Sequence, residues 1–262
     1  MSKVYLGLDV GSVSIDAALV DESGEISWSL YRRHKGAPLL MAADVIEEAL
    51  SLLDGSELAG MATTGSGGKL VAEHCGATFV NEIVAATRAC ARLYPEARTL
   101  IDMGGEDSKL VIFEPDEAGG MRVADFSMNT VCAAGTGSFL DEQAARLGLN
   151  IETEFGELAL RSENPPTIAG RCSVFAKTDM IHLQQLATPD YDIVAGLCFA
   201  LARTFRSNIG RGKEFAAPVI FQGGVAANAG MIRAFREVLD LEEGELIIPE
   251  HYGVMSLSLI HI

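Results

Sequence analysis

Two of the five cysteines stand directly before stretches that are predicted to begin helices. Cys132 precedes a turn of small residues that includes Gly135, and Cys172 lies 40 residues further on, before a predicted helix that runs to Gln185. Small residues let backbone amides approach a ligand, and a helix N-terminus has unpaired N–H groups and a partial positive charge. Because a thiolate-ligated metal cluster is an anion, we interpret the two cysteines as ligands of an iron–sulfur cluster that two copies of the chain share.

An acidic residue at the end of a strand, followed by a glycine turn and a second strand, occurs twice. The two copies, 93 residues apart, are Asp9-Val10-Gly11-Ser12 with Ser14 after it, and Asp102-Met103-Gly104-Gly105. A hydroxyl-rich turn can wrap a phosphate, and a carboxylate can hold Mg²⁺ through water. The repetition predicts duplicated βββαβα halves that face each other, with both acids and both turns against one triphosphate. Each turn alone also fits an ordinary hairpin.

A third glycine turn joins the last long buried strand to a helix. Gly223 and Gly224 follow the predicted strand 218–222, and a flat ring could lie on their backbone. Asn228 is the predicted N-cap of the helix 229–239. The alternative is a tight strand-to-helix connection without a ligand.

Other residues with possible chemistry favour structural roles. The segment 64–69 superficially resembles a Walker loop, but it does not meet the GxxxxGK[ST] spacing, and we interpret it as a flexible loop before a helix. Cys75, Cys90 and Cys198 lie in apolar or helical settings and are expected to be buried. His182 is expected to be a surface or packing residue rather than a ligand.

The elements that must position these residues form an α/β chain. Period-2 alternation and β-branched runs predict strands over 3–10, 15–20, 25–32, 58–63, 99–103, 110–113, 122–127, 218–222 and 246–248. Helical periodicity predicts helices over 38–53, 70–74, 81–93, 150–161 and 191–206, besides the two helices after the cysteines. We divide the chain into a first half, 1–98, and a second half with the cysteine helices, 99–262.

Composition limits the class of protein. The chain has 262 residues and a formal net charge of −16, and no basic cluster could neutralise nucleic-acid phosphates. No apolar run approaches the roughly 20 residues of a membrane span, and the N-terminus does not resemble a signal peptide. Five cysteines without short-spaced pairs predict a reducing compartment, the cytoplasm. We therefore expect neither a nucleic-acid nor a membrane partner.

Together, these motifs resemble a known family. The three turns, with Asp107 and Lys109 after the second, are similar to the nucleotide signatures of the acetate and sugar kinase, Hsp70 and actin superfamily. With Cys132-Ala133-Ala134-Gly135-Thr136-Gly137 and Cys172-Ser173-Val174-Phe175-Ala176 added, the chain resembles the BadF/BadG/BcrA/BcrD type of ATPase from about Val4 to Pro249. This type includes the activators of 2-hydroxyacyl-CoA dehydratases, also described as CoA-substrate-specific enzyme activases, and the ATPase subunits of benzoyl-CoA reductase.

The resemblance implies an actin-like, ribonuclease H-like fold around a nucleotide cleft, and a homodimer with one [4Fe–4S] cluster on Cys132 and Cys172 of each chain. It also implies that ATP hydrolysis drives an electron from a ferredoxin or flavodoxin to a dehydratase or reductase. Asp9 and Asp102 would then govern Mg²⁺ and the attacking water. The residues that would hold the phosphates are Gly11, Ser12, Ser14, Gly104, Gly105 and Lys109, and those for the adenosine are Gly223, Gly224 and Asn228.

Two positions depart from the family pattern. Glu106 stands where many short activators carry Gln, and a carboxylate near the phosphates could slow hydrolysis or help to bind Mg²⁺. After His251 the family continues into a Met-Gly-Ala-Leu-Gly-Ala-Ala stretch that starts a last helix, whereas this chain reads VMSLSLIHI from Val254. We expect a truncated fragment or a foreign tail, and a lost last helix would weaken ATP binding.

Two other functions fit the same residues. A small-molecule kinase of this fold would phosphorylate a sugar or an acid, and Cys132→Ser would leave its activity unchanged. A non-catalytic module would keep the fold without turnover, and the unusual tail favours this alternative.

Overall fold

The computed structural model describes residues 2–116, 120–129 and 134–258. The chain divides into two compact units, Met1–Pro95 with Gly253–Ile262 and Glu96–Tyr252. The predicted halves were 1–98 and 99–262, and the last segment of the chain was assigned to the second of them. Val254 and Leu257 are buried in a cluster with Ala18 and Val20 of the first unit, and this burial attaches the end of the chain to that unit.

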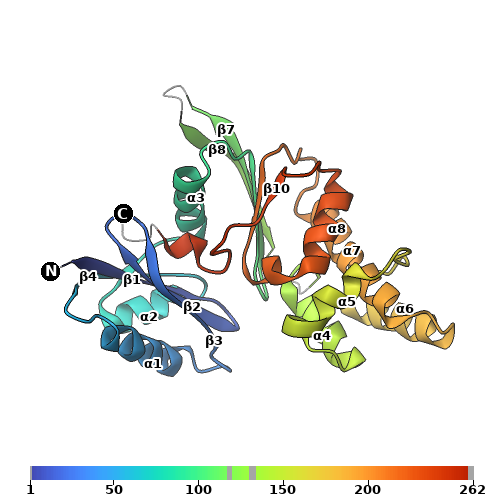
Figure 1. Cartoon of the computed structure of the whole chain (residues 1–262), viewed down its shortest axis with the longest axis horizontal. Helices are drawn as coiled ribbons and strands as arrows, with labels where there is room; N and C mark the ends of the chain where they lie inside the picture. Colours follow the sequence, from blue (N-terminus) through green and yellow to red (C-terminus); the bar gives the residue numbers. More distant parts are fainter. Residues whose placement is uncertain (1, 117–119, 130–133, 259–262) are drawn as a thin grey trace. The chain divides into compact units, whose positions relative to one another are not determined.

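The first unit is built on a five-stranded mixed sheet in the order β3-β2-β1-β4-β5. Strands β1, β2 and β3 form an antiparallel meander, and β4 and β5 add in parallel. Helices α1 and α2 cover one face (Figure 1), and α3 packs on a 3₁₀ turn near the C-terminus. The bounds are β1 Lys3–Val10, β2 Ser14–Asp21, β3 Ile26–Arg33, α1 Pro38–Ser51, β4 Glu57–Thr64, α2 Gly68–Cys75, β5 Thr78–Phe79, α3 Glu82–Leu93 and the 3₁₀ turn Met255–Leu257.

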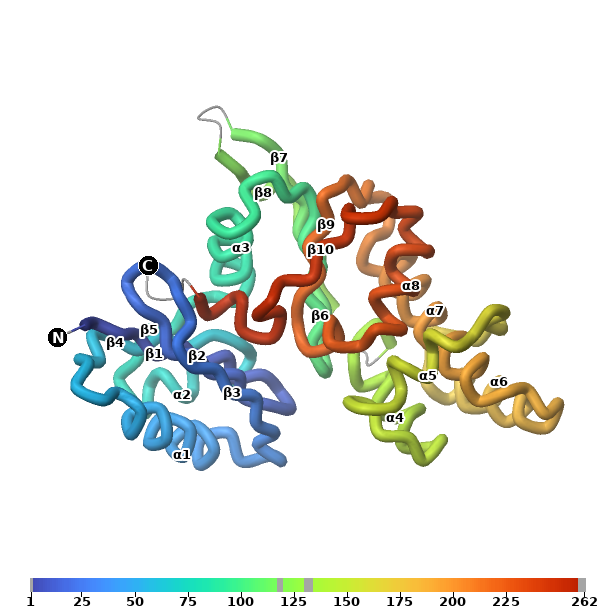
Figure 2. Tube along the Cα trace, viewed as in Figure 1, coloured from blue at the N-terminus to red at the C-terminus, as the bar shows by residue number. Residues whose placement is uncertain are grey.

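The second unit has a five-stranded sheet in the order β10-β9-β6-β7-β8. Figure 2 shows β9 next to β6, although the two strands are far apart in the sequence. The bounds of the strands are β6 Thr99–Met103, β7 Ser108–Pro115, β8 Met121–Asn129, β9 Val219–Gln222 and β10 Leu246–Ile247. The helices are α4 Gly137–Leu147, α5 Gly156–Leu160, α6 Ser173–Gln185, α7 Asp190–Asn208 and α8 Ala229–Leu239, with a π-helical turn at Ile151–Phe155 and a 3₁₀ turn at Gly224–Ala227.

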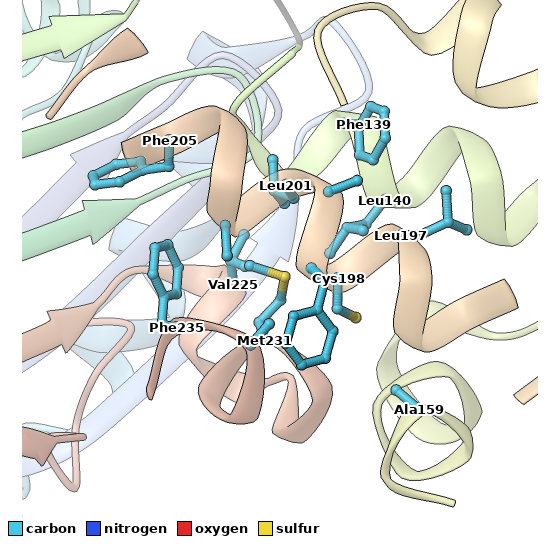
Figure 3. Packing of buried hydrophobic residues seen from close by; sticks show 14 of the residues in the cluster. Phe139, Leu140, Ala159, Leu197, Cys198, Leu201, Phe205, Val225, Met231 and Phe235 are labelled. Atoms are coloured by element: carbon cyan, nitrogen blue, oxygen red, sulfur yellow. The ribbon is translucent and has the colours of Figure 1, made fainter. Parts of the chain in front are cut away.

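Helix α7 is the centre of the second unit. Its side chains are buried from Ile193 through Ala202, on every side of the helix, and it contacts α4, α5, α6 and α8. Figure 3 shows Leu140 of α4, Cys198 of α7 and Met231 of α8 in one packed cluster. Because a helix that is apolar all round must be enclosed, α7 is a rigid support for the segments laid on it.

The predicted duplication is confirmed by the strand topology. Read from the meander side, β3-β2-β1-β4-β5 matches β8-β7-β6-β9-β10, with the same parallel and antiparallel neighbours. The two acids occupy equivalent positions, each the last residue but one of its strand: Asp9 of β1 lies opposite Thr64 of β4, and Asp102 of β6 lies opposite Gln222 of β9. One supersecondary unit therefore occurs twice.

Most of the predicted strands and helices are present, with ends shifted by a few residues. The prediction missed the two-residue strand β5 and the 3₁₀ turns. Cys90 and Cys198 are buried as expected, whereas Cys75 is only half-buried, and His182 is exposed. Among the residues that the structure describes, no helix is both long and apolar enough to cross a membrane.

Candidate functional site

The Asp102 carboxylate is held by two side chains from neighbouring strands. The Gln222 Nε2 donates a hydrogen bond of 2.9 Å to Asp102 Oδ2. The Lys109 Nζ lies 3.9 Å from the same oxygen and 2.7 Å from Asp107 Oδ2, and Lys109 is only 5% exposed. A nearly buried ammonium group between two carboxylates gives this turn a fixed charge pattern. Asp102 and Lys109, both predicted site residues, are therefore brought together.

The backbone closes tightly over the same acid. Gly223 has a φ of 89°, and a Cβ built there would collide with Met103 O and lie 2.8 Å from Asp102 Oδ1. In the turn between β6 and β7, Gly104 N donates to Asp107 O at 3.0 Å. Glu106 in this turn is exposed, and Gly105 is too. Only glycine fits at position 223, because any side chain would displace the carboxylate or the carbonyl.

Asn228 caps α8 as predicted. Its Oδ1 accepts from Met231 N at 3.1 Å, and the side chain is 9% exposed. Its Nδ2 is buried without a protein acceptor among the described residues. A buried amide donor without a partner costs free energy, and a ligand acceptor would satisfy it. Gly224, which begins the 3₁₀ turn before the cap, is exposed.

The Asp9 turn of the first unit has the same construction. Gly11 N donates to Ser14 O at 2.9 Å, and Ser12 is exposed at the tip of the turn. Gly65 has a φ of 85°, and a Cβ there would collide with Asp9 Oδ1 and lie 2.6 Å from Val10 O. Gly65 therefore stands to Asp9 as Gly223 stands to Asp102.

This finding corrects the interpretation of residues 64–69 as a flexible loop. Gly67 N donates to Val10 O at 2.8 Å, and the preceding Thr64 is fully buried. The Thr64 Oγ1 has no protein partner in the described part of the chain, although Thr64 is the strand neighbour of Asp9. The segment is thus the counterpart, in the first unit, of the Gly223 turn. The signal in the sequence was a glycine directly after a buried strand, at the position that Gly223 has after β9.

The predicted metal ligand Cys132 lies outside the described residues, in the gap 130–133. The residues on either side of the gap are tied together, because Asn129 Nδ2 donates to Ala134 O at 3.1 Å. Asn129 and Ala134 line one hollow of the surface together with Arg171, the residue before Cys172, and Asn208. The flanks of both cysteine segments thus border the same hollow.

Cys172 is a half-buried free thiol at the N-cap position of α6. Among the described residues, no side chain caps α6 and no acidic residue lies in its first turn. The same holds for α4, which follows the Cys132 segment. Helix N-termini without acidic caps favour a bound anion. No group of three or more potential metal ligands occurs among the described residues. A cluster that two chains share needs only two thiolates from each, so Cys172 fits one half of such a ligand set.

Three hydrogen bonds join the Asp102 turn to the start of α4. Gly137 N donates to Gly104 O at 2.9 Å, and Ser138 N donates to Gly105 O at 2.7 Å. The buried hydroxyl of Ser108 donates to Gly135 O at 2.6 Å. The helix that follows Cys132 is therefore bonded directly to the predicted phosphate turn. This bond could not be predicted from the sequence, because the partner of Ser108 is a backbone carbonyl 27 residues further along the chain.

Comparison with known proteins finds relatives that match this chain over nearly its whole length. The (R)-2-hydroxyglutaryl-CoA dehydratase activating ATPase of Acidaminococcus fermentans is 29% identical over 99% of this chain and 97% of its own length. One of the benzoyl-CoA reductase subunits of Thauera aromatica is 26% identical over 95% of this chain and 87% of its own.

A solved structure of an activator has a similar fold. The activator of the 2-hydroxyisocaproyl-CoA dehydratase from Clostridium difficile, solved with bound ADPNP, is 28% identical with a TM-score of 0.81, over 97% of this chain and 91% of that one. The fold is thus the predicted actin-like ATPase fold. The model of the BadF/BadG/BcrA/BcrD ATPase family matches residues 6–255, and the chain belongs to this family.

Proposed function

We propose that this protein hydrolyses ATP to drive a low-potential electron, through an iron–sulfur cluster, to a 2-hydroxyacyl-CoA dehydratase or a benzoyl-CoA reductase type of partner. Membership of an ATPase family and the likeness to named activators and to part of a reductase support this function. The observation that carries it is the set of three hydrogen bonds between the Asp102 turn and the start of α4. Through these bonds, a change at the phosphates would reach the cysteine segment.

In this proposal both acids would serve one Mg·ATP. Asp9 and Asp102 would hold Mg²⁺ through water and orient the water that attacks the γ-phosphate, and the reaction would release ADP and phosphate. Lys109 is held next to Asp102 by Asp107 and would neutralise phosphate charge. Glu106 is exposed in the same turn, where its carboxylate would affect the rate or the Mg²⁺ affinity.

Backbone groups do the remaining nucleotide binding. The turns at Gly11, Ser12 and Ser14 and at Gly104 and Gly105 would donate to phosphate oxygens. Gly223 and Gly224 would carry the adenosine. The Asn228 Nδ2, which has no acceptor within the described ranges, is a donor that the nucleotide could satisfy. The fit of these groups to an anionic ligand with a divalent cation supports ATP and Mg²⁺.

Cys132 and Cys172 of two chains would hold one [4Fe–4S] cluster per homodimer, and a bound cluster would supply one-electron chemistry. Gly135 would lie in the backbone around it, and the uncapped N-termini of α4 and α6 would stabilise its negative charge. The chain itself would supply the thiolates that bind the cluster, and it would change the surroundings of the cluster when the phosphates change. The electron donor would be a ferredoxin or a flavodoxin, in the cytoplasm, since the free thiols suit a reducing compartment.

The experiment is anaerobic purification, with iron, quaternary structure and ATP turnover measured together. We expect a coloured dimer with about four irons per dimer. Cys172→Ser should abolish the iron, whereas the matched control Cys75→Ser should keep it, because Cys75 is also half-buried and only donates to Val71 O. A colourless monomer with intact cysteines would contradict the cluster.

Coupling is tested with Ser108→Ala. The variant loses the bond to Gly135 O but none of the phosphate contacts, so ATP turnover should persist. The change in the circular dichroism of the cluster on addition of Mg·ATP should then be weaker than in the wild type. Transfer of the γ-phosphate to a sugar or acid, with an unaffected rate in Cys172→Ser, would instead indicate a kinase.

A further inference from the structure

The segment that leads to Cys172 is laid closely on α7. Gly170 is buried, and a Cβ built there would collide with both Ala200 O and Thr204 Oγ1. On α7, Gly196 faces the same segment, and a Cβ there would lie 2.7 Å from Pro166 O. We call residues 165–171 the cysteine strap. Glycines on both surfaces let its backbone approach the rigid central helix.

A carboxylate on α6, that of Asp179, forms a hydrogen bond with the backbone of the cysteine strap. The Asp179 Oδ2 accepts a hydrogen bond of 2.8 Å from Ala169 N. Asp179 lies seven residues, about two helical turns, after Cys172, so the two positions share one face of α6. The bond therefore closes a ring from Cys172 along the helix to Asp179 and back through Ala169.

We propose that Asp179 is a positioning residue that fixes Cys172, by holding the strap before it against the helix after it. This inference rests on the proposed function, in which Cys172 is a cluster ligand. The Cys172 backbone is extended, with φ −156° and ψ 128°, so the chain turns between strap and helix at the cysteine itself. A bond from Ala169 to Asp179 is what limits the direction of the thiol at this turn.

The support for Cys172 differs from that of the segment before α4. The strap is bonded to α6 and packs on α7, whereas Gly135 and Gly137 are bonded to the Asp102 turn. A change at the phosphates would then move the start of α4 while Cys172 stays with the core. In this proposal, Asp179 sets the geometry of Cys172, the cluster ligand that does not move with the phosphates.

The test uses two substitutions and a control on the same helix. Asp179→Ala removes the acceptor, Asp179→Asn keeps an oxygen that can accept from Ala169 N, and His182→Ala changes an exposed residue. The first readout is alkylation of Cys172 by iodoacetamide in the metal-free chain, followed by mass spectrometry of its peptide. Burial raises the pKa of Cys198 to about 12, so at pH 8 that thiol does not compete.

We expect Asp179→Ala to raise the alkylation rate of Cys172 about tenfold, the effect of losing one hydrogen bond, and Asp179→Asn and His182→Ala to stay near the wild-type rate. In cluster-loaded dimers, Asp179→Ala should also shift the reduction potential, and Asp179→Asn should not. Equal rates in all four proteins, or an Asp179→Asn variant as reactive as Asp179→Ala, would overturn the proposal.

A measurement on the unaltered chain covers the case in which Asp179→Ala does not fold. The Ala169 amide should be protected from hydrogen exchange to the same degree with and without Mg·ATP, while the Gly137 amide should change. An unprotected Ala169 amide would overturn the proposal. The alkylation and hydrogen-exchange readouts need no iron, so failure of the wild-type chain to bind a cluster would refute the proposed function without deciding the role of Asp179.

Discussion

The two units share a backbone at their acid turns but differ in charge. Asp9 and Asp102 are each covered by a glycine with positive φ, Gly65 and Gly223, which could not accept a Cβ. On the antiparallel neighbour, however, Asp16 stands opposite Asp9 and Lys109 stands opposite Asp102. The two turns therefore have the same backbone shape, but the residue opposite the acid is acidic in the first unit and basic in the second.

Although both acids are proposed to hold Mg²⁺, we expect the Asp9 turn to contribute more to the cation and the Asp102 turn more to the phosphates. An acidic pair across two strands suits a hydrated divalent cation, because like charges opposite each other are otherwise unfavourable. An acid next to a nearly buried lysine suits an anion, because the ammonium is already positioned. The unit with the lysine is also the one whose turn is bonded to α4. We therefore expect substitutions in the two turns to affect different kinetic parameters.

The largest effect is expected from the acids themselves. Asp102→Asn should lower ATP turnover by about 10²–10³, the usual cost of removing one electrostatic group that acts on the transition state. Asp9→Asn should do the same at low Mg²⁺ and recover partly at high Mg²⁺, because it weakens the cation site. The control is Asp44→Asn on the exposed side of α1. Equal Mg²⁺ dependence in both variants would remove the distinction between the turns.

The second-largest effect is expected from Gly65 and Gly223, the glycines that cover the two acids. Gly65→Ala and Gly223→Ala should each destabilise the fold by roughly 2–4 kcal/mol, because positive φ and a steric clash add. Gly55→Ala and Gly244→Ala are matched controls, since both have positive φ but nothing within 4 Å of the new Cβ, and they should cost about 1 kcal/mol. Urea unfolding measures all four. A similar cost in all four would show that the acids are not tightly covered.

The lysine distinguishes the turns directly. Lys109→Met should leave Asp102 and Asp107 without their cation and destabilise the chain by roughly 1–3 kcal/mol, a value below that of fully buried pairs because Asp107 is partly exposed. The affinity for ATP should fall as well. The matched substitution in the other unit, Asp16→Asn, should change stability less than Lys109→Met does when Mg²⁺ is absent. An equal loss of stability in the two variants would contradict the charge difference.

The sequence predicted the elements because their signals are local. Strand β1 has the predicted bounds, and the Asn228 cap is read from one residue before a helix. The symmetry of Gly65 with Gly223 was not predicted, because the need for glycine at position 65 comes from Asp9, a residue 56 positions earlier that approaches it only in the folded sheet.

Two supporting residues were missed for a related reason. In the sequence, Ser108 is a polar residue between a glycine turn and a predicted strand, and Asp179 is an ordinary carboxylate on a predicted helix. Their partners, Gly135 O and Ala169 N, are backbone atoms, which carry no sequence signal of their own. Side-chain chemistry at the acids and cysteines could thus be predicted, while the bonds that hold these groups in place needed coordinates.

The smallest effect concerns the residues next to the acids on the parallel strands. Gln222 donates to Asp102, whereas the buried Thr64 hydroxyl next to Asp9 has no protein partner in the described ranges. Thr64→Val should therefore leave the nucleotide-free chain as stable or up to about 1 kcal/mol more stable, because it removes an unsatisfied polar atom. Gln222→Leu should cost about 1 kcal/mol.

Bound Mg·ATP should reverse the effect of Thr64→Val on stability relative to the wild type. If the hydroxyl serves the hydrated cation, Mg·ATP should stabilise Thr64→Val less than it stabilises the wild type, and thermal unfolding with and without Mg·ATP measures this difference. A Thr64→Val variant that Mg·ATP stabilises as much as the wild type would mean that the orphan hydroxyl has no part in the site. The difference between the turns would then rest on the charged neighbours, Asp16 opposite Asp9 and Lys109 opposite Asp102, and on the bonds that tie the Asp102 turn to α4.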